Sequence, residues 1–166
     1  MSKRILKHII KQCKSNSIAE LLEALNFPEI GNIINTTYNG TTPLWMSCIR
    51  SSIDVVDILI EHGADPNMCS VDHNELPIHA ACEGDWFAKE KCLKLLGINN
   101  HNLNTPRGET YVDRLPTSIA ASKGNEELVQ MLLDRGAHYH IIGQSLGSGP
   151  LHAAATRGNI GILHLL

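Results

Sequence analysis

Two short segments of this chain bring together histidine and cysteine side chains that could bind a metal ion. Cys69 and His73 share one polar segment, and His138 and His140 form a His-x-His pair in another. Structural zinc needs four ligands at defined spacing, and neither segment belongs to such a four-ligand pattern. The sequence therefore predicts no metal site and no cofactor.

No catalytic motif accompanies these residues. The chain contains no G-x-S-x-G, H-E-x-x-H, P-loop or Rossmann pattern. The glycine-rich segment 143–149 lacks the lysine of a phosphate-binding loop, and its composition favours the tip of a hairpin. Catalysis also needs reactive groups held in a pocket. The sequence therefore predicts a protein that is not an enzyme.

The composition limits both the fold and the class of partner. Of the 166 residues, 43% are hydrophobic and only 4% are aromatic, so the core must be mainly aliphatic. That balance suits thin helical layers better than a large β-sandwich. The net charge of -3 provides no basic excess, which argues against nucleic acid as a partner.

The cysteine content and the apolar segments indicate where the protein works. Five cysteines, an odd number with no C-x-x-C pair, favour reduced thiols over a disulfide framework. The basic N-terminal segment lacks the unbroken apolar stretch of a signal peptide. No run approaches the roughly 18 apolar residues that span a bilayer. We therefore expect a cytoplasmic protein, with a nuclear location as the alternative and no membrane partner.

An internal repeat positions all these residues. Prolines at 43, 77, 116 and 150 each open a short apolar segment, with spacings of 34, 39 and 34 residues. A second apolar segment of helical periodicity follows each, as in IDVVDILIEHGA and NEELVQMLLDRGA. Proline suits the first turn of a helix, and Thr42 can cap the helix that begins at Pro43. The chain therefore reads as stacked pairs of short helices.

These segments resemble the ankyrin signature T-P-L-H-x-A-A, G-N, L-L-x-x-G-A-D-x-N, which repeats every 33 residues. The resemblance is carried by TTPLW, LPIHAA, GPLHAAATRGN and ILIEHGADPN, and it runs from about residue 36 to the last residue, with a weaker match before it. It implies an all-α fold, an α-solenoid of helix-turn-helix units joined by hairpin fingers. A finger here is the loop that leads from one repeat into the next. The implied units are a capping repeat at 1–40, repeats at 41–74, 75–113 and 114–147, and a truncated repeat at 148–166.

Two units depart from the pattern. The third is five residues longer, with about two extra residues in the helix around 85–89 and three in the loop 99–114. That loop is either a recognition element or a tolerated insertion. At least one of Trp86 and Phe87 is expected in the core. Trp45 replaces the signature histidine, and it is either an exposed binding anchor or a side chain packed between repeats. His79 and His152 match the histidine and are predicted to be structural.

The resemblance implies that a partner lies along the concave side, on the fingers and inner helices. The nominated residues are Trp45, Ile49, Arg50, Glu83, Lys123 and Arg157 on the inner helices, and Tyr38, Met68, Asp72, His73, Arg107, Glu109, Tyr111, Arg114, Tyr139 and His140 on the fingers. The mostly basic strip of Arg50, Lys123 and Arg157, interrupted by Glu83, favours an acidic peptide, or is an ordinary solvated face.

Three functions remain open. The first is docking of another protein or peptide by a monomer. The second is a regulatory or targeting module N-terminal to a larger enzyme such as a kinase or ubiquitin ligase, with another domain of the same chain as partner. The third is a spacer in a longer array. The chain ends inside a second helix without a polar cap, so we expect the natural protein to continue.

Overall fold

A computed structural model of the protein describes residues 2–72, 74–84, 87–98, 103–105, 115–139 and 149–166. The described part of the chain is helical, and its strand pairing consists of two isolated bridges. The helices are α1 (Ser2–Ser15), α2 (Ile18–Leu25), α3 (Ile30–Ile33), α4 (Pro43–Arg50), α5 (Ile53–Glu61), α6 (Pro77–Glu83), α7 (Ala88–Ile98), α8 (Pro116–Lys123), α9 (Glu126–Asp134), α10 (Pro150–Arg157) and α11 (Ile160–Leu165).

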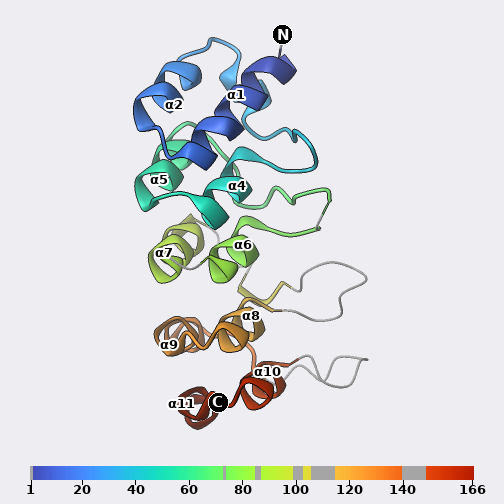
Figure 1. Ribbon diagram of the computed structural model, residues 1–166, viewed down its shortest axis with the longest axis vertical. Helices are drawn as coiled ribbons and strands as arrows, with labels where there is room; N and C mark the ends of the chain where they lie inside the picture. Colours follow the sequence, from blue (N-terminus) through green and yellow to red (C-terminus); the bar gives the residue numbers. More distant parts are fainter. Residues whose placement is uncertain (1, 73, 85–86, 99–102, 106–114, 140–148) are drawn as a thin grey trace.

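The helices form a column of two layers that runs from the N-terminus to the C-terminus (Figure 1). The inner layer is α1, α4, α6, α8 and α10, and the outer layer is α2, α5, α7, α9 and α11. We name the pairs first to fifth repeat, from α1–α2 to α10–α11. Each helix packs against its partner and against the same layer of the next repeat. The predicted all-α solenoid is confirmed, and the single turn α3 is an element that the sequence did not predict.

Local sequence sets the ends of these helices. A proline occupies the first turn of α4, α6, α8 and α10, where its missing amide hydrogen costs no helical hydrogen bond. The Thr42 side chain accepts a hydrogen bond from the Trp45 amide at 3.2 Å, so the predicted cap of α4 is confirmed. Asn125 caps α9 in the same way through the Leu128 amide at 2.9 Å.

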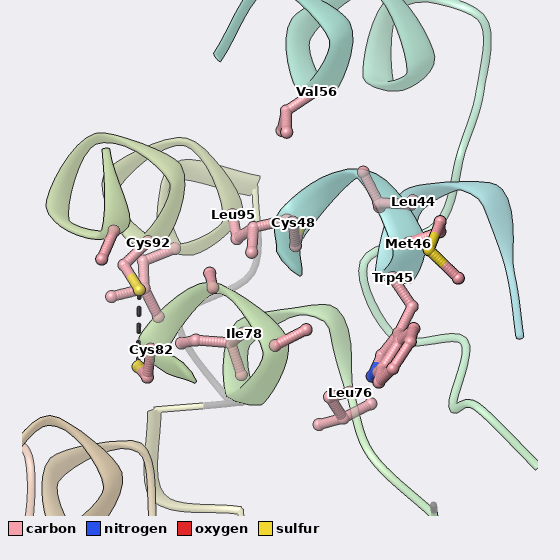
Figure 2. Close-up of a cluster of buried hydrophobic side chains, with 14 of the residues drawn as sticks. Leu44, Trp45, Met46, Cys48, Val56, Leu76, Ile78, Cys82, Cys92 and Leu95 are labelled. Atoms are coloured by element: carbon pink, nitrogen blue, oxygen red, sulfur yellow. Dashed lines mark hydrogen bonds between the residues drawn. The ribbon is translucent and has the colours of Figure 1, made fainter. Parts of the chain in front are cut away.

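The core runs between the layers and is built from aliphatic and small side chains (Figure 2). Alanines such as Ala80 and Ala120 are fully buried in the inner helices, where their small size allows the repeats to pack closely. Val56 and Leu132, on outer helices, are also fully buried. One repeat alone has too few neighbours to bury these faces, so stability depends on stacking.

The third repeat is distorted as well as longer. Its outer helix α7 has 11 residues, against nine in α5 and α9. Because α7 begins only at Ala88, the prediction that the two extra residues around 85–89 lengthen the helix is not confirmed. Phe87, just before α7, has a φ of 56° and is 51% exposed. Its side chain is therefore not part of the core, and Trp86, the other half of that expectation, lies outside the described residues.

Candidate protein-docking surface

The histidine of the signature ties a helix to the next finger. His79 lies two residues after Pro77 and is fully buried. Its Nδ1 accepts a hydrogen bond from the Leu76 amide at 3.1 Å. In that tautomer Nε2 donates to the carbonyl oxygen of Thr105, 2.8 Å away in the finger after α7. The predicted structural role of His79 is confirmed. His152 occupies the corresponding place in α10 but is exposed, so its structural role stays a prediction.

In the second repeat, Trp45 also holds the next finger by a hydrogen bond, but with an indole donor and a carboxylate acceptor. It is only 6% exposed, and its side chain extends from α4 toward Leu76 of the next repeat (Figure 2). The indole Nε1 donates a hydrogen bond to the buried Glu75 Oε2 at 3.2 Å. The nomination of Trp45 as an exposed binding anchor is therefore wrong, because its polar atom is used to hold the following finger.

Two asparagines connect successive fingers. Asn35 Nδ2 donates to the Gly63 carbonyl at 2.9 Å, and Asn35 Oδ1 accepts from the Asp65 amide at 2.7 Å. Asn104 makes the equivalent pair of bonds two repeats further on, to Gly136 at 3.2 Å and His138 at 2.7 Å. Asn35 and Asn104 thus join the bases of their fingers to the following repeat.

The first two finger tips are also stacked. Tyr38 pairs with Thr41, and Ser70 pairs with Glu75, which makes each finger a narrow hairpin. The Gly40 carbonyl accepts hydrogen bonds from the Val71 amide at 2.7 Å and from Ser70 Oγ at 2.9 Å. Gly40 has a φ of 69°, and a Cβ there would lie 1.9 Å from the Asp72 carboxyl carbon. A residue with a Cβ would therefore strain the backbone at this position and displace the Asp72 side chain.

Apolar side chains are exposed on the second finger. Met68 is 36% exposed and Val71 is 70% exposed, beside the exposed Asp72. The two described tyrosines, Tyr38 and Tyr139, are partly buried, and Tyr38 packs against the core. Val71 was missed at the sequence level. The signal for it was an aliphatic residue within the polar run Ser-Val-Asp-His-Asn.

Four nominated residues form a row along the inner layer. Arg50, Lys123 and Arg157 are exposed in the last turns of α4, α8 and α10, and Glu83 is partly buried at the end of α6. These helices pack in the order α4, α6, α8, α10, so the four residues follow one another. We call them the inner-helix row. A basic residue in the last turn also interacts favourably with the helix dipole.

Of the remaining nominated residues, Ile49 is partly buried and packs against the core, which limits it to an edge contact. The nominated His73, Arg107, Glu109, Tyr111, Arg114 and His140 lie outside the described residues.

Charged residues of the outer layer are used between repeats. Lys94 Nζ lies 2.9 Å from Asp57 Oδ2, which joins α7 to α5. Lys89 pairs with Glu127, which joins α7 to α9. In the part of the chain that the structure describes, Arg50, Lys123 and Arg157 have no ion-pair partner. Among the described residues, the inner layer therefore presents exposed cations that form no ion pair.

The buried cysteines are unreactive thiols. All five are free thiols, and Cys69 alone is exposed. Burial raises the pKa of Cys13 and Cys48 from 9.0 to about 12. The pKa of Cys92 is raised as well, first by its contact with Cys82 Sγ at 3.5 Å and then by burial. Such thiols stay protonated near neutral pH and are poor nucleophiles. Among the described residues there is no cluster of three metal-ligating side chains, and no helix is long and apolar enough to cross a membrane.

Comparison with known proteins extends this picture. Two family models, both described as ankyrin repeats, match residues 6–107 and 118–166. The chain is 30% identical over 144 residues to the ankyrin repeat and ELMO domain-containing protein D of Dictyostelium discoideum, with 82% of this chain and 11% of that protein covered. It is 28% identical over 154 residues to the mouse B-cell lymphoma 3 protein homolog, with 91% and 34% covered.

A human relative, ankyrin repeat and SOCS box protein 16, is 31% identical over 149 residues, with 86% of this chain and 31% of that protein covered. The chain thus spans between about a tenth and a third of the length of these three relatives. The similarity is consequently that of a shared repeat segment.

Proposed function

This chain belongs to the ankyrin-repeat proteins, a family of protein–protein interaction modules, and we propose that it docks a protein or an extended peptide on the side formed by its fingers and inner helices. The contact residues of this proposal are the inner-helix row together with Met68, Val71 and Asp72 on the second finger. In this proposal the chain acts by binding alone.

The observation that carries the proposal is the unequal use of charge in the two layers. The outer layer uses Lys89 and Lys94 to join repeats, whereas the exposed cations of the inner-helix row have no ion-pair partner among the described residues. A cation that stabilises no internal contact is available to a partner. Three such cations lie on helices of the same layer, which gives a partner an extended line of contacts.

The fixed fingers support docking with little rearrangement. Trp45 and His79 each hold the finger that follows their own repeat, and Asn35 joins the first finger to the end of α5. A preformed surface loses little conformational entropy on binding, so a larger share of the contact energy appears as affinity. We therefore expect the backbone to move by less than about 1 Å when the partner binds, as in other pre-organised complexes.

The charge of the row favours a particular kind of partner. Three cations with one intervening carboxylate, Glu83, are complementary to an acidic peptide that carries a polar or basic residue at its centre. Exposed charge pairs contribute more to the association rate and specificity than to affinity. The apolar tip of Met68 and Val71 supplies area that can be removed from water, which completes a mixed surface.

The test is a triple charge reversal, Arg50→Glu, Lys123→Glu and Arg157→Glu. All three side chains are exposed, so the far-ultraviolet circular dichroism spectrum should be unchanged. Proteins captured from a cytosolic extract by the original chain are identified by mass spectrometry, and binding of the candidate is then measured by titration. We expect the triple variant to weaken that binding by more than tenfold.

A matched control separates charge from location. The variant Lys3→Glu with Arg135→Glu reverses two exposed basic residues outside the inner-helix row, on α1 and at the end of α9, and is compared with the double reversal Lys123→Glu, Arg157→Glu. If this control weakens the partner as strongly as the inner-helix variant, general electrostatic attraction explains the binding and the proposed surface is wrong.

A second candidate function is a regulatory or targeting module of a larger protein, such as a kinase or a ubiquitin ligase. It is favoured by the length of the relatives, of which this chain spans only 11%, 34% and 31%. In that case the partner is another domain of the same chain. Cross-links from Met68→Cys in the full-length protein to a different domain would support this candidate, and cross-links only to other proteins would contradict it.

We also propose that the chain is a monomer of the cytoplasm or nucleus. Its five free thiols, four of them buried, are consistent with a reducing compartment. Light scattering after size-exclusion chromatography should give a mass near 18.2 kDa. A mass twice as large would overturn the monomer.

A further inference from the structure

The first helix has a charge unlike the rest of the chain. α1 carries five basic residues and no acidic one. The other residues contain nine basic and 17 acidic side chains, a net charge of -8. The basic residues of α1 are Lys3, Arg4, Lys7, Lys11 and Lys14, all exposed. Because helical neighbours recur every three or four residues, Arg4, Lys7, Lys11 and Lys14 follow one side of the helix.

A groove lies beside this basic row. It has a volume of about 880 Å³ and is lined by residues of α1 and α2 and by Phe27. These two helices lie at the N-terminal end of the column (Figure 1). All of its lining residues come from the first repeat. They are Arg4, Lys7, His8 and Lys11 on the α1 rim, Glu20 and Glu23 on the α2 rim, and Ile5, Ala24 and Phe27 between them. One rim is therefore cationic, the other anionic, and the centre apolar.

The opposite charges of the rims do not neutralise each other. Within the described residues no ion pair joins α1 to α2, although both carry exposed charges along the same groove. In the outer layer, by contrast, opposite charges on neighbouring helices do meet, as Lys94 and Asp57 do at 2.9 Å. The first repeat thus keeps two charged rims apart with an open apolar strip between them.

We propose that this groove is a second docking site, which takes an amphipathic helix of a partner protein. Its apolar residues pack on Ile5, Ala24 and Phe27, its carboxylates face α1, and its basic residues face Glu20 and Glu23. This is helix-in-groove recognition, in which side chains at i, i+3, i+4 and i+7 anchor the helix. The basic row from Arg4 to Lys14 extends about 15 Å, about three turns of such a helix.

The groove has one cationic and one anionic rim, which favours a helix that carries both charges over a wholly anionic partner. A lipid surface or a nucleic acid presents negative charge to both rims, so its attraction to α1 is opposed by repulsion from Glu20 and Glu23. A helix with acidic residues on one flank and basic residues on the other satisfies both rims at once. The charge pattern also fixes the direction in which the helix lies, because reversal would place like charges together.

The experiment uses a fluorescein-labelled synthetic 18-residue helix as the probe. It has leucines along one seam, glutamates on one flank and lysines on the other, and its binding to the chain is followed by fluorescence anisotropy. A second peptide has glutamine in place of every charged residue. We expect saturable binding of the charged peptide, and binding of the glutamine peptide that is about tenfold weaker.

Two variants locate the site. Lys7→Gln with Lys11→Gln should weaken the charged peptide about three- to tenfold, because two exposed charge pairs are lost. The matched pair Lys3→Gln with Arg135→Gln removes the same charge at two exposed residues outside the groove lining and should leave the affinity unchanged. Neither pair touches the inner-helix row, so the result does not depend on the docking surface proposed above.

Three results would overturn the inference. The first is no saturable binding of the charged peptide, and the second is equal affinity of the two chain variants for it. The third is binding to phosphatidylserine vesicles that is lost in the Lys7→Gln, Lys11→Gln variant while the peptide does not bind. That outcome would assign the basic helix to a membrane surface instead.

Discussion

The second and third repeats meet one requirement with different side chains. In each of these repeats, the residue two positions after the proline must donate a hydrogen bond that holds the next finger. In the third repeat His79 donates to a backbone carbonyl, that of Thr105, and also accepts from the Leu76 amide. In the second repeat Trp45 donates to a side chain, Glu75. The repeat therefore specifies a contact between neighbours, and more than one residue type can make it.

The same two repeats differ at a buried position of the outer helix. Counted from the paired residues Leu95–Leu96 and Leu59–Ile60, Lys91 of α7 corresponds to Val55 of α5, and both are buried. Lys91 Nζ donates to the Cys48 carbonyl at 2.9 Å. This carbonyl lies in the last turn of α4, where the backbone carbonyls have no hydrogen-bond donor within the helix. A long cationic side chain thus caps a helix in the preceding repeat, where valine only fills space.

The largest expected effect is on the contact that Trp45 makes. Trp45→Ala removes a buried ring and the donor to Glu75, and we expect it to lower the free energy of unfolding by about 3–5 kcal/mol. Urea unfolding followed by circular dichroism measures this value. A loss below 1 kcal/mol would show that the indole is not an organising side chain of the second repeat.

The next prediction compares the two contacts directly by replacing each polar ring with the apolar ring of phenylalanine. His79→Phe should cost about 2–4 kcal/mol, because it leaves the Leu76 amide and the Thr105 carbonyl without their ring partner. Trp45→Phe removes a single donor and should cost about 1–3 kcal/mol. Urea unfolding of both variants ranks them. A larger loss for Trp45→Phe than for His79→Phe would mean that ring size, and not hydrogen bonding, dominates this position.

Much of the fold could be predicted because the same sequence pattern recurs in each repeat, so the helices assigned in one repeat could be compared with those in the others. The prolines at 43, 77, 116 and 150 locate four helix starts, and the paired leucines locate the outer helices. The turn α3 was missed because it has four residues, and so short a helix carries no periodicity. Phe87 is exposed and has a positive φ, and the expectation that at least one of Trp86 and Phe87 lies in the core stays a prediction, because Trp86 lies outside the described residues.

The site was harder to predict than the fold. Arg50, Lys123 and Arg157 were nominated from their repeated positions at helix ends, where the structure places all three exposed, and their role in docking stays a prediction. Trp45 was nominated as exposed because its partner, Glu75, lies 30 residues away, and no local pattern reports such a bond. The groove of the first repeat was not predicted, because α1 and α2 together define its volume and a single helix indicates only a polar face.

A smaller effect concerns the thiol at the end of α4. The folded pKa of Cys48 is raised by burial from 9.0 to about 12, so in alkali the unfolded chain loses this proton before the folded one does. Stability that is present below pH 9 is therefore lost as the pH rises toward 12. At pH 10 the loss is about 1.4 kcal/mol for this thiol. Cys48→Ala should flatten the decline between pH 8 and 10 by that amount, measured by urea unfolding at each pH.

The smallest expected effect has the opposite sign and belongs to the third repeat. Burial lowers the pKa of Lys91, and the nearby thiols Cys48 and Cys92 oppose this only in part. The folded chain therefore releases the lysine proton at a lower pH than the unfolded chain, and stability rises with pH across that interval. Relative to Lys91→Met, the original chain should gain stability as the pH rises from 8 to 10. Lys14→Met, at an exposed lysine of α1, is the control for loss of a charge.

If the original chain gains as much stability relative to Lys14→Met as relative to Lys91→Met, the overall charge of the protein explains the effect. A falling difference would mean that the Cys48 carbonyl holds the ammonium form more strongly than burial disfavours it. In that case the charged Lys91 side chain would cap α4. It would then stabilise the stack more than the corresponding Val55 of the second repeat does. The direction of the difference between pH 8 and 10 therefore decides whether a buried cation strengthens or weakens the stack at this position.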